Sequence, residues 1–189
     1  KPQWVMSVLR GKRKTFGNLE GHVKGMSGVK SLGEWTSRQF DPTLSWKDVA
    51  WIRSLWPGKL VLKGILDVED ARIAADNGVD AIVVSNHGGR QLDGAMSSIK
   101  ALPPIAEAVG DKVEILFDGG IRSGQDVLRA LALGARACMA GRAFLYGLGA
   151  GGQAGVAKAI EIIRNELDVS MALTGTTRVA DVDRRVLAS

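Results

Sequence analysis

A histidine and an arginine follow within six residues of a β-branched run in the stretch Ile82-Val-Val-Ser-Asn-His-Gly-Gly-Arg-Gln-Leu-Asp93. An imidazole can remove a proton at physiological pH, and a guanidinium can hold a carboxylate with two parallel hydrogen bonds. A buried strand that ends in a glycine loop delivers such side chains into the crevice at the carboxyl end of a parallel sheet. We therefore predict that His87 is a general base and that Arg90 binds a carboxylate.

Two glycine-rich segments, Asp118-Gly-Gly-Ile-Arg-Ser-Gly124 and Gly141-Arg142, each follow a short apolar run. Backbone N–H groups at such turns, together with a helix N-terminus, bind phosphate in many barrels of alternating strands and helices. Arg122 and Arg142 could add charge-assisted hydrogen bonds to a phosphate or to a cofactor ring. We predict a phosphate site here. The alternative is that these glycines only form turns.

Lys63 interrupts the otherwise apolar run from Leu60 to Ile65. Lysine is seldom fully buried, so a lysine that points into a barrel mouth usually faces an anion or a developing negative charge. The alternative is a side chain that reaches solvent at the strand end. The residues so far indicate a carboxylate substrate, a base and a phosphate-bearing cofactor near Lys63. They do not identify that cofactor, because pyridoxal phosphate would also use a lysine and many barrels bind sugar phosphates.

Strands and helices alternate from residue 41 onward, which places these side chains at strand ends. The hydrophobic periodicity predicts strands at 60–65, 81–85, 113–117 and 137–140. It predicts helices at 45–56, 68–77, 97–109 and 124–133, a long helical region through 156–167 followed by 169–173, and a last helix at 179–187. Pro103-Pro104 should bend or delay the third helix. This alternation predicts an α/β fold with a parallel sheet, and it favours a (β/α)8 TIM barrel over a doubly wound sheet.

The length and composition suit one well-cored α/β domain. The chain has 189 residues, of which 46% are hydrophobic, whereas a complete (β/α)8 barrel usually needs about 250 residues. Four strands therefore indicate the C-terminal half of a barrel, strands five to eight with their helices. The single cysteine, Cys138, excludes an intrachain disulfide and suits a reducing compartment. No apolar segment approaches the roughly 20 residues of a membrane-spanning helix.

Residues 1–40 differ from the rest in their weak periodicity and basic charge. We predict a short helix around Trp4–Leu9 followed by a mobile basic loop, with residues 41–189 forming the barrel half. Apolar residues at Val23, Met26, Val29, Leu32 and Trp35 form a weakly amphipathic face, which suits contact with a membrane surface and contact with a partner equally. A nucleic acid, an acidic partner or a solvated loop are the alternatives. His22 lies in this segment and receives no role.

From about Phe40 to its end, the chain resembles the FMN-dependent α-hydroxy-acid dehydrogenase and oxidase family. The resemblance rests on Lys63-Gly64, Ser85-Asn-His-Gly-Gly-Arg-Gln-Leu-Asp93, Asp118-Gly-Gly-Ile-Arg122 and Gly141-Arg142, in that order. The second of these motifs is far more specific than a lone glycine pair. The segments Phe40-Asp-Pro-Thr-Leu-Ser-Trp-Lys47 and Lys63-Gly-Ile-Leu66 are most similar to those of bacterial L-lactate dehydrogenases.

The resemblance implies a role for each candidate residue. His87 would take a proton from a 2-hydroxy acid, such as L-lactate, and Arg90 would hold its carboxylate. Lys63 would stabilise negative charge on the reduced flavin, and Ser85 would contact the flavin ring. The remaining FMN-binding residues, which would hold the ribityl phosphate, are Asp118, Gly119, Gly120, Ile121, Arg122, Gly141 and Arg142. The product would be a 2-oxo acid, with hydride and carbanion routes both open and with a quinone or oxygen as electron acceptor.

The resemblance also implies that half of the active site lies outside this chain. The first four strands, the tyrosines that touch substrate and the acidic partner of His87 belong to the N-terminal half of the barrel. We expect that half as a second chain or as a further segment of the same protein, and activity only in its presence. The resemblance implies a homotetramer, and in some members of the family the segment that corresponds to residues 1–40 binds membrane. We expect a cytoplasmic protein that could contact the inner face of the plasma membrane through these residues, with no metal and no nucleic acid bound. The alternative functions are an oxygen-using oxidase and a non-catalytic phosphate-binding half-barrel.

Overall fold

The computed structural model describes residues 2–11, 35 and 38–187, and it divides into two units, Lys1–Ser45 and Trp46–Ser189. In the first unit, helix α1 spans Pro2–Arg10, which confirms the short helix predicted there. Of the weak apolar face predicted from Val23 to Trp35, only Trp35 is among the described residues. The mobile loop predicted for this segment therefore stays a prediction.

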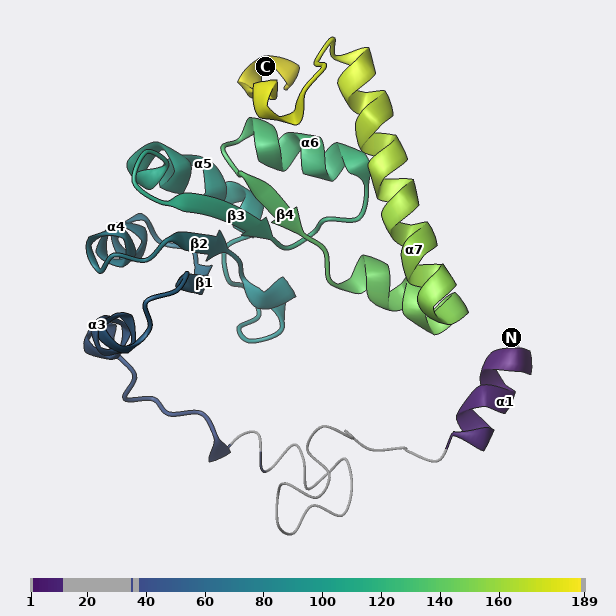
Figure 1. The fold of residues 1–189 in the computed structure, drawn as a ribbon, viewed down its shortest axis with the longest axis horizontal. Coiled ribbons are helices and arrows are strands. Elements are labelled where there is room, and N and C mark those ends of the chain that lie inside the picture. The colour runs from purple at the N-terminus through teal and green to yellow at the C-terminus, as the bar shows by residue number, and fades with distance from the viewer. Residues whose placement is uncertain (1, 12–34, 36–37, 188–189) are drawn as a thin grey trace. The chain divides into compact units, whose positions relative to one another are not determined.

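Four parallel strands form one sheet in the second unit, in the order β1-β2-β3-β4 (Figure 1). The strands are β1 Val61–Ile65, β2 Ala81–Val84, β3 Glu114–Asp118 and β4 Ala137–Met139. Each end lies within one residue of the predicted end. Consecutive strands that pair in parallel have the order of successive units in a (β/α)8 barrel. The expected α/β class and the half-barrel arrangement are confirmed.

In the second unit, one helix precedes the sheet, and each strand is followed by a further helix. The helices are α3 Trp46–Leu55, α4 Val68–Asp76, α5 Ser98–Val109, α6 Gly124–Ala132 and α7 Arg142–Leu173. Helix α7 joins the long helical regions predicted separately, and it is kinked where Gly151 and Gly152 leave the helical conformation. Within the described part of the chain, no helix is long and apolar enough to cross a membrane.

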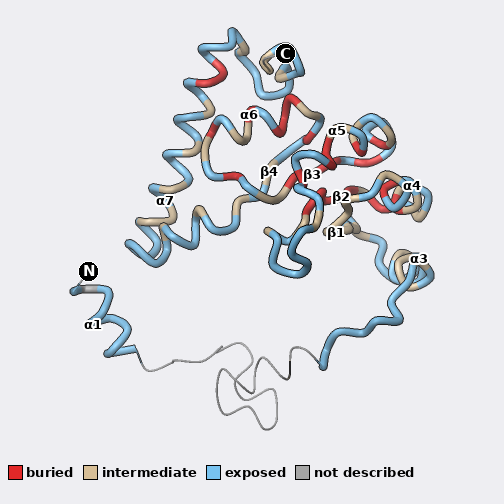
Figure 2. Tube along the Cα trace, turned by 180° about the vertical axis from the view of Figure 1, so that it is seen from behind, coloured by how far each residue is buried: buried red, intermediate tan, exposed pale blue. Residues whose placement is uncertain are grey.

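The core lies between the sheet and the helices α4, α5 and α6, where Figure 2 shows most of the buried residues. Successive strand residues point to opposite faces, so Ile82, Val84 and Phe117 face the helices and are almost fully buried. Lys63 and Asp118 therefore lie on the other face, which corresponds to the interior of a barrel. The two outer strands are more open than the middle pair, with Val61 44% exposed on β1 and Met139 43% exposed on β4.

The last predicted helix, at 179–187, is wrong. The structure has two single turns of 3-10 helix instead, η2 Val179–Asp181 and η3 Arg184–Val186, separated by extended backbone at Val182 and Asp183. The Asp183 side chain accepts a hydrogen bond from the backbone N–H of Arg185 at 2.9 Å. An aspartate that bonds to nearby backbone offers the chain an alternative to the helix, and here it starts a new turn.

Pro103 and Pro104 do not delay helix α5, which starts at Ser98 and continues through both prolines. Each proline removes one helical hydrogen bond, to the carbonyl group four residues earlier. Those carbonyls belong to Ile99 and Lys100, which are exposed. Water can satisfy them, which lowers the cost of the two prolines to the helix.

Candidate active site

A hollow of about 240 Å³ lies at the carboxyl ends of the strands. It brings together every predicted site residue except Ser85, along with three residues not predicted: Gly88, Met139 and Leu145. The predicted residues that line it are Lys63, His87, Arg90, Asp118, Gly119, Gly120, Ile121, Arg122, Gly141 and Arg142. Four of these are lysine or arginine and only Asp118 is acidic, so the hollow attracts anions such as phosphate and carboxylate groups.

Ser85 lies behind the hollow as the centre of a hydrogen-bond cluster. Its side chain is fully buried, and its hydroxyl donates to Asp118 Oδ2 at 2.9 Å. The Ser85 hydroxyl oxygen in turn accepts hydrogen bonds from Lys63 Nζ at 2.9 Å and from the backbone N–H of His87 at 3.1 Å. One serine therefore connects the cation on β1, the carboxylate on β3 and the loop that carries the histidine.

Lys63 and Asp118 also form a direct ion pair across the intervening strand β2. Burial favours the neutral form of the Asp118 carboxyl group, but the hydrogen bonds from Lys63 and Ser85 outweigh burial. They hold the pKa of Asp118 below its ordinary value. The Asp118 carboxylate therefore stays ionised at neutral pH and holds the Lys63 side chain at the edge of the hollow.

The loop after β2 holds His87 in a backbone conformation that only a few non-glycine residues adopt. Its φ is +55°, and it is the sole non-glycine residue with positive φ in the described ranges. Gly88 and Gly89 continue the turn with φ of 69° and 72°. The Asn86 side chain stabilises it by accepting a hydrogen bond from the N–H of Gly88 at 3.0 Å. Sequence reasoning missed this role, although asparagine side chains commonly bond to the backbone two residues further on in a turn.

The two predicted phosphate loops differ in how their helices begin. At the start of α6, Ser123 and Asp126 form a capping box, and Glu166 of α7 accepts a hydrogen bond from the N–H of Gly124 at 2.8 Å. At the start of α7, Gly141 provides no side-chain hydrogen bond to the helix. The N-terminus of a helix without a side-chain cap is a suitable site for an anion.

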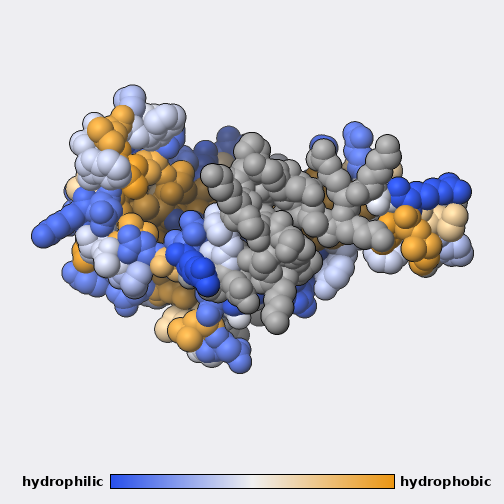
Figure 3. All heavy atoms as spheres, turned by 90° about the horizontal axis from the view of Figure 1, so that it is seen from below, coloured by the Kyte–Doolittle hydropathy of each residue, from blue (hydrophilic) through white to orange (hydrophobic). Residues whose placement is uncertain are grey.

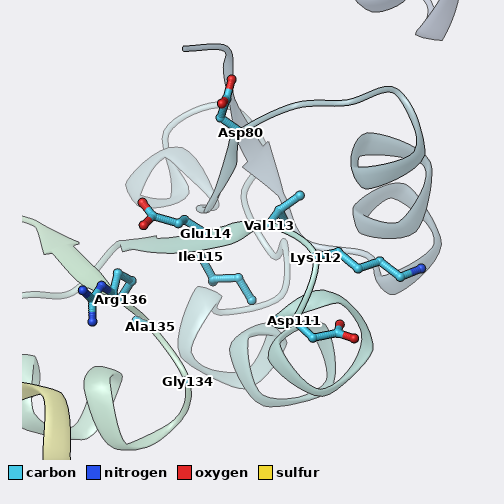
Figure 4. A pocket seen from close by; sticks show the side chains of 10 residues that line it. Asp80, Asp111, Lys112, Val113, Glu114, Ile115, Gly134, Ala135 and Arg136 are labelled. Atoms are coloured by element: carbon cyan, nitrogen blue, oxygen red, sulfur yellow. The ribbon is translucent and has the colours of Figure 1, made fainter.

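A second hollow, of about 450 Å³, opens at the opposite ends of the strands (Figure 4). Asp80, at the start of β2, accepts hydrogen bonds there from Lys59 at 2.7 Å, from the N–H of Leu60 at 2.9 Å and from Arg53 at 3.0 Å. These bonds lower the pKa of Asp80 to about 2. The amino ends of barrel strands serve stability, whereas the carboxyl ends carry the chemistry. We therefore assign this hollow no catalytic role.

No group of three or more histidine, cysteine, aspartate or glutamate side chains is placed to hold a metal ion among the described residues. The hollow at the carboxyl ends combines four cationic side chains and several glycines with a histidine. These features define a class of protein: an α/β half-barrel that gathers polar side chains at the strand ends where such barrels carry their chemistry.

The family model for FMN-dependent dehydrogenases matches residues 1–189, and the chain belongs to this family. L-lactate dehydrogenase from Caulobacter sp. (strain K31) is 51% identical over 189 residues, which cover 100% of this chain and 50% of that protein. L-lactate dehydrogenase from Actinobacillus pleuropneumoniae serotype 5b (strain L20) is 50% identical over 187 residues, which cover 98% of this chain and 49% of that protein.

Two solved structures share the fold. The monotopic membrane protein (S)-mandelate dehydrogenase has a TM-score of 0.86 at 36% identity, covering 99% of this chain and 49% of that one. A mandelate oxidase has a TM-score of 0.78 at 46% identity, covering 84% and 46%. The chain therefore spans about half the length of the relatives it matches. The family and its cofactor, FMN, are those expected from the sequence motifs.

Proposed function

We propose that this chain supplies half of the active site of an FMN-dependent enzyme that oxidises an L-2-hydroxy acid to the 2-oxo acid. The observation that carries this proposal is the hollow at the carboxyl ends of the strands. There a histidine and an arginine from one loop, His87 and Arg90, share a cationic site with Lys63 and the two glycine-rich loops. The remaining part of the site would come from the N-terminal half of the barrel.

The residues at the hollow fit the phosphate end of FMN. A methyl group built on the backbone at Gly120 or Gly141 would meet no atom within 4 Å, so an anion can approach both backbones closely. Arg122 and Arg142 line the same space and would contribute charge-assisted hydrogen bonds. The Asp118 carboxylate would repel a phosphate, so we assign it to Lys63 and to the hydroxyl groups of the ribityl chain.

The side chains of this chain would divide the work on the substrate. Arg90 would bind the carboxylate and orient the molecule. Oxidation of the alcohol to a ketone removes two protons and two electrons, and His87 would take one of the two protons. FMN, when bound, supplies the acceptor for the electron pair and the second proton. Lys63, held by Ser85 and Asp118, would keep a positive charge on the side of the site where negative charge accumulates.

L-lactate is the substrate that we propose, because the curated relatives with about 50% identity are named L-lactate dehydrogenase. The solved relatives act on mandelate, which shares the 2-hydroxy-acid group and differs in its side chain. A quinone is the proposed electron acceptor, with oxygen as the alternative. We further propose that the complete enzyme is a homo-oligomer in the cytoplasm.

The exposed apolar residues of α1 support a further proposal, contact with the inner face of the plasma membrane. Trp4 and Leu9 are 52% and 65% exposed, and Figure 3 shows hydrophobic and hydrophilic residues side by side on this helix. A related mandelate dehydrogenase is a monotopic membrane protein. Replacing Trp4 and Leu9 by serine should weaken sedimentation with phosphatidylglycerol vesicles. The matched control is Trp51→Ser on α3, where the tryptophan is 61% exposed. Equal binding by all three proteins would contradict membrane contact through α1.

The test of the proposed activity uses the protein with both barrel halves. Its flavin absorbance should bleach when L-lactate is added without oxygen, and His87→Gln should slow this bleaching by about 10²- to 10⁴-fold while FMN stays bound. His22→Gln, the replacement of the other histidine in the chain, should bleach at the normal rate. Bleaching of His87→Gln at the normal rate would contradict the assignment of His87 as the base. Absence of any flavin would remove the proposed function.

A further inference from the structure

Strand β1 contains a bulge at Gly64, directly next to Lys63. Residues Lys63 and Ile65 pair with the adjacent residues Val83 and Val84 of β2, so Gly64 is one residue more than the partner strand has. Its φ is +104°. Bulges next to active sites commonly redirect a strand end and change what can approach it. The bulge therefore has a candidate function beyond the shape of the sheet.

The space above the Gly64 backbone is filled by the ring of His87. A Cβ atom built at Gly64 would lie 2.8 Å from His87 Cε1, 3.6 Å from Nδ1 and 3.8 Å from Nε2. Carbon atoms in contact are normally about 3.5–4.0 Å apart, so a side chain at Gly64 and the present ring position exclude each other. The imidazole has this position only because residue 64 has no side chain.

Hydrogen bonds to Ser85 and Asn86 fix the backbone of His87 and of the turn that follows it. The hydroxyl of Ser85 holds the N–H of His87 at 3.1 Å, and the Asn86 side chain fixes the following turn. The ring itself is the free end of an exposed side chain. A methyl group at Gly64 would therefore displace the imidazole and leave the loop in place.

We propose that Gly64 is a positioning residue, which seats the imidazole of His87 for proton removal from the 2-hydroxy acid. This inference rests on the proposed function, in which His87 is the base. It assigns the bulge in β1 a specific purpose, because the bulge brings a backbone without a side chain against the catalytic ring. A displacement of about 1 Å in a reacting group can cost on the order of 10²-fold in rate.

The experiment compares Gly64→Ala with Gly78→Ala in the full-length protein with bound FMN. Gly78 also has positive φ, +72°, but a methyl group there would approach only Arg53 Cδ, at 4.0 Å. Both variants should show a similar loss of thermal stability from backbone strain. Only Gly64→Ala should lower kcat, by about 10²-fold, with KM for L-lactate little changed because Arg90 is not displaced. Equal kcat in the two variants would overturn the proposal.

A double variant separates this inference from the proposed function. If Gly64 acts through the imidazole, Gly64→Ala should cost almost nothing further in the His87→Gln background. A full additional loss would overturn the positioning role while leaving His87 as the base. Unchanged turnover in His87→Gln alone would instead refute the proposed function. The NMR signal of ¹³Cε1-labelled His87 provides a readout without turnover, and it should move in Gly64→Ala and not in Gly78→Ala.

Failure of Gly64→Ala to fold would also be informative. In that case His87→Ala is added to the same chain, which removes the ring that the new methyl group would meet. Recovery of folding to the level of Gly78→Ala would support the contact. Failure to recover would show that strain at residue 64 alone is responsible and would overturn the proposal.

Discussion

Lys63 and Asp118 are 55 residues apart in the chain, yet their ammonium and carboxylate groups form an ion pair at the carboxyl end of the sheet. The pair spans β1 and β3 over the intervening strand β2, and the Ser85 hydroxyl bonds to both partners. An ammonium group held by two neighbours loses little further freedom when a ligand binds, which is the advantage of a preorganised charge.

Lys63→Met should therefore weaken FMN binding and raise the pKa of Asp118. Burial raises the pKa of Asp118, and without Lys63 only the hydrogen bonds from Ser85 and the backbone would lower it. Loss of one charge-assisted hydrogen bond is worth about 1.5–3 kcal/mol, or roughly 10- to 100-fold in the Kd of FMN. Flavin fluorescence during titration of the apoprotein measures this affinity. Lys59→Met is the control, since Lys59 is 85% exposed and pairs with Asp80 at the opposite ends of the strands. Equal affinities would contradict the role of Lys63.

Arg90→Lys should raise KM for L-lactate more than it lowers kcat. Lysine keeps the positive charge but cannot form two parallel hydrogen bonds with a carboxylate. We expect KM to rise by about 10- to 100-fold, the cost of one hydrogen bond to a charged group. Steady-state kinetics across substrate concentrations separate the two parameters. Arg136→Lys, in the hollow at the opposite strand ends, should change neither. An unchanged KM would exclude Arg90 as the carboxylate ligand.

The sequence predicted the strands and the grouping of the candidate residues at one edge of the sheet, for a physical reason. Runs of β-branched residues that end in glycine mark strands whose carboxyl ends meet at one edge of a parallel sheet. Residues as far apart as Lys63 and Arg142 could therefore be placed in one hollow, as the structure shows. The prediction of a last helix was wrong because the Asp183 side chain bonds to nearby backbone and so competes with helical hydrogen bonds. Hydrophobic periodicity does not detect such competition.

Details that depend on strand register could not be predicted. The bulge at Gly64 appears only when β1 is aligned with β2, and the contact with His87 depends on it. The same alignment brings Ser85 between Lys63 and Asp118. Sequence motifs indicated that these residues lie near a cofactor, but not that they bind one another.

Asp80→Asn should reduce the dependence of stability on pH below about pH 4. The bonds from Lys59, Leu60 and Arg53 lower the pKa of Asp80 from 3.8 to about 2. A lowered pKa means that the ionised carboxylate stabilises the folded state fully above pH 4, and that this contribution is lost as the pH falls toward 2. Asparagine has no such contribution to lose. Urea unfolding at pH 7 and at steps down to pH 2 measures the difference. The control is Asp111→Asn, which removes an exposed carboxyl group at the same hollow. This variant should show the same dependence of stability on pH as the unchanged protein.

Cys138 should be almost unreactive in the folded protein. Its side chain packs against the core between β4 and the helices, and burial raises the pKa of the thiol from 9.0 to about 12. Only the thiolate attacks a thiol reagent, and a pKa about 3 units higher reduces its fraction at pH 8 by roughly 10³-fold. Alkylation by iodoacetamide, quantified on the peptide that contains Cys138, should therefore be slow in the folded protein and fast in urea at the same pH. Rapid labelling without denaturant would contradict this expectation. It would show that strand β4, which contains Cys138, opens to solvent in the folded protein.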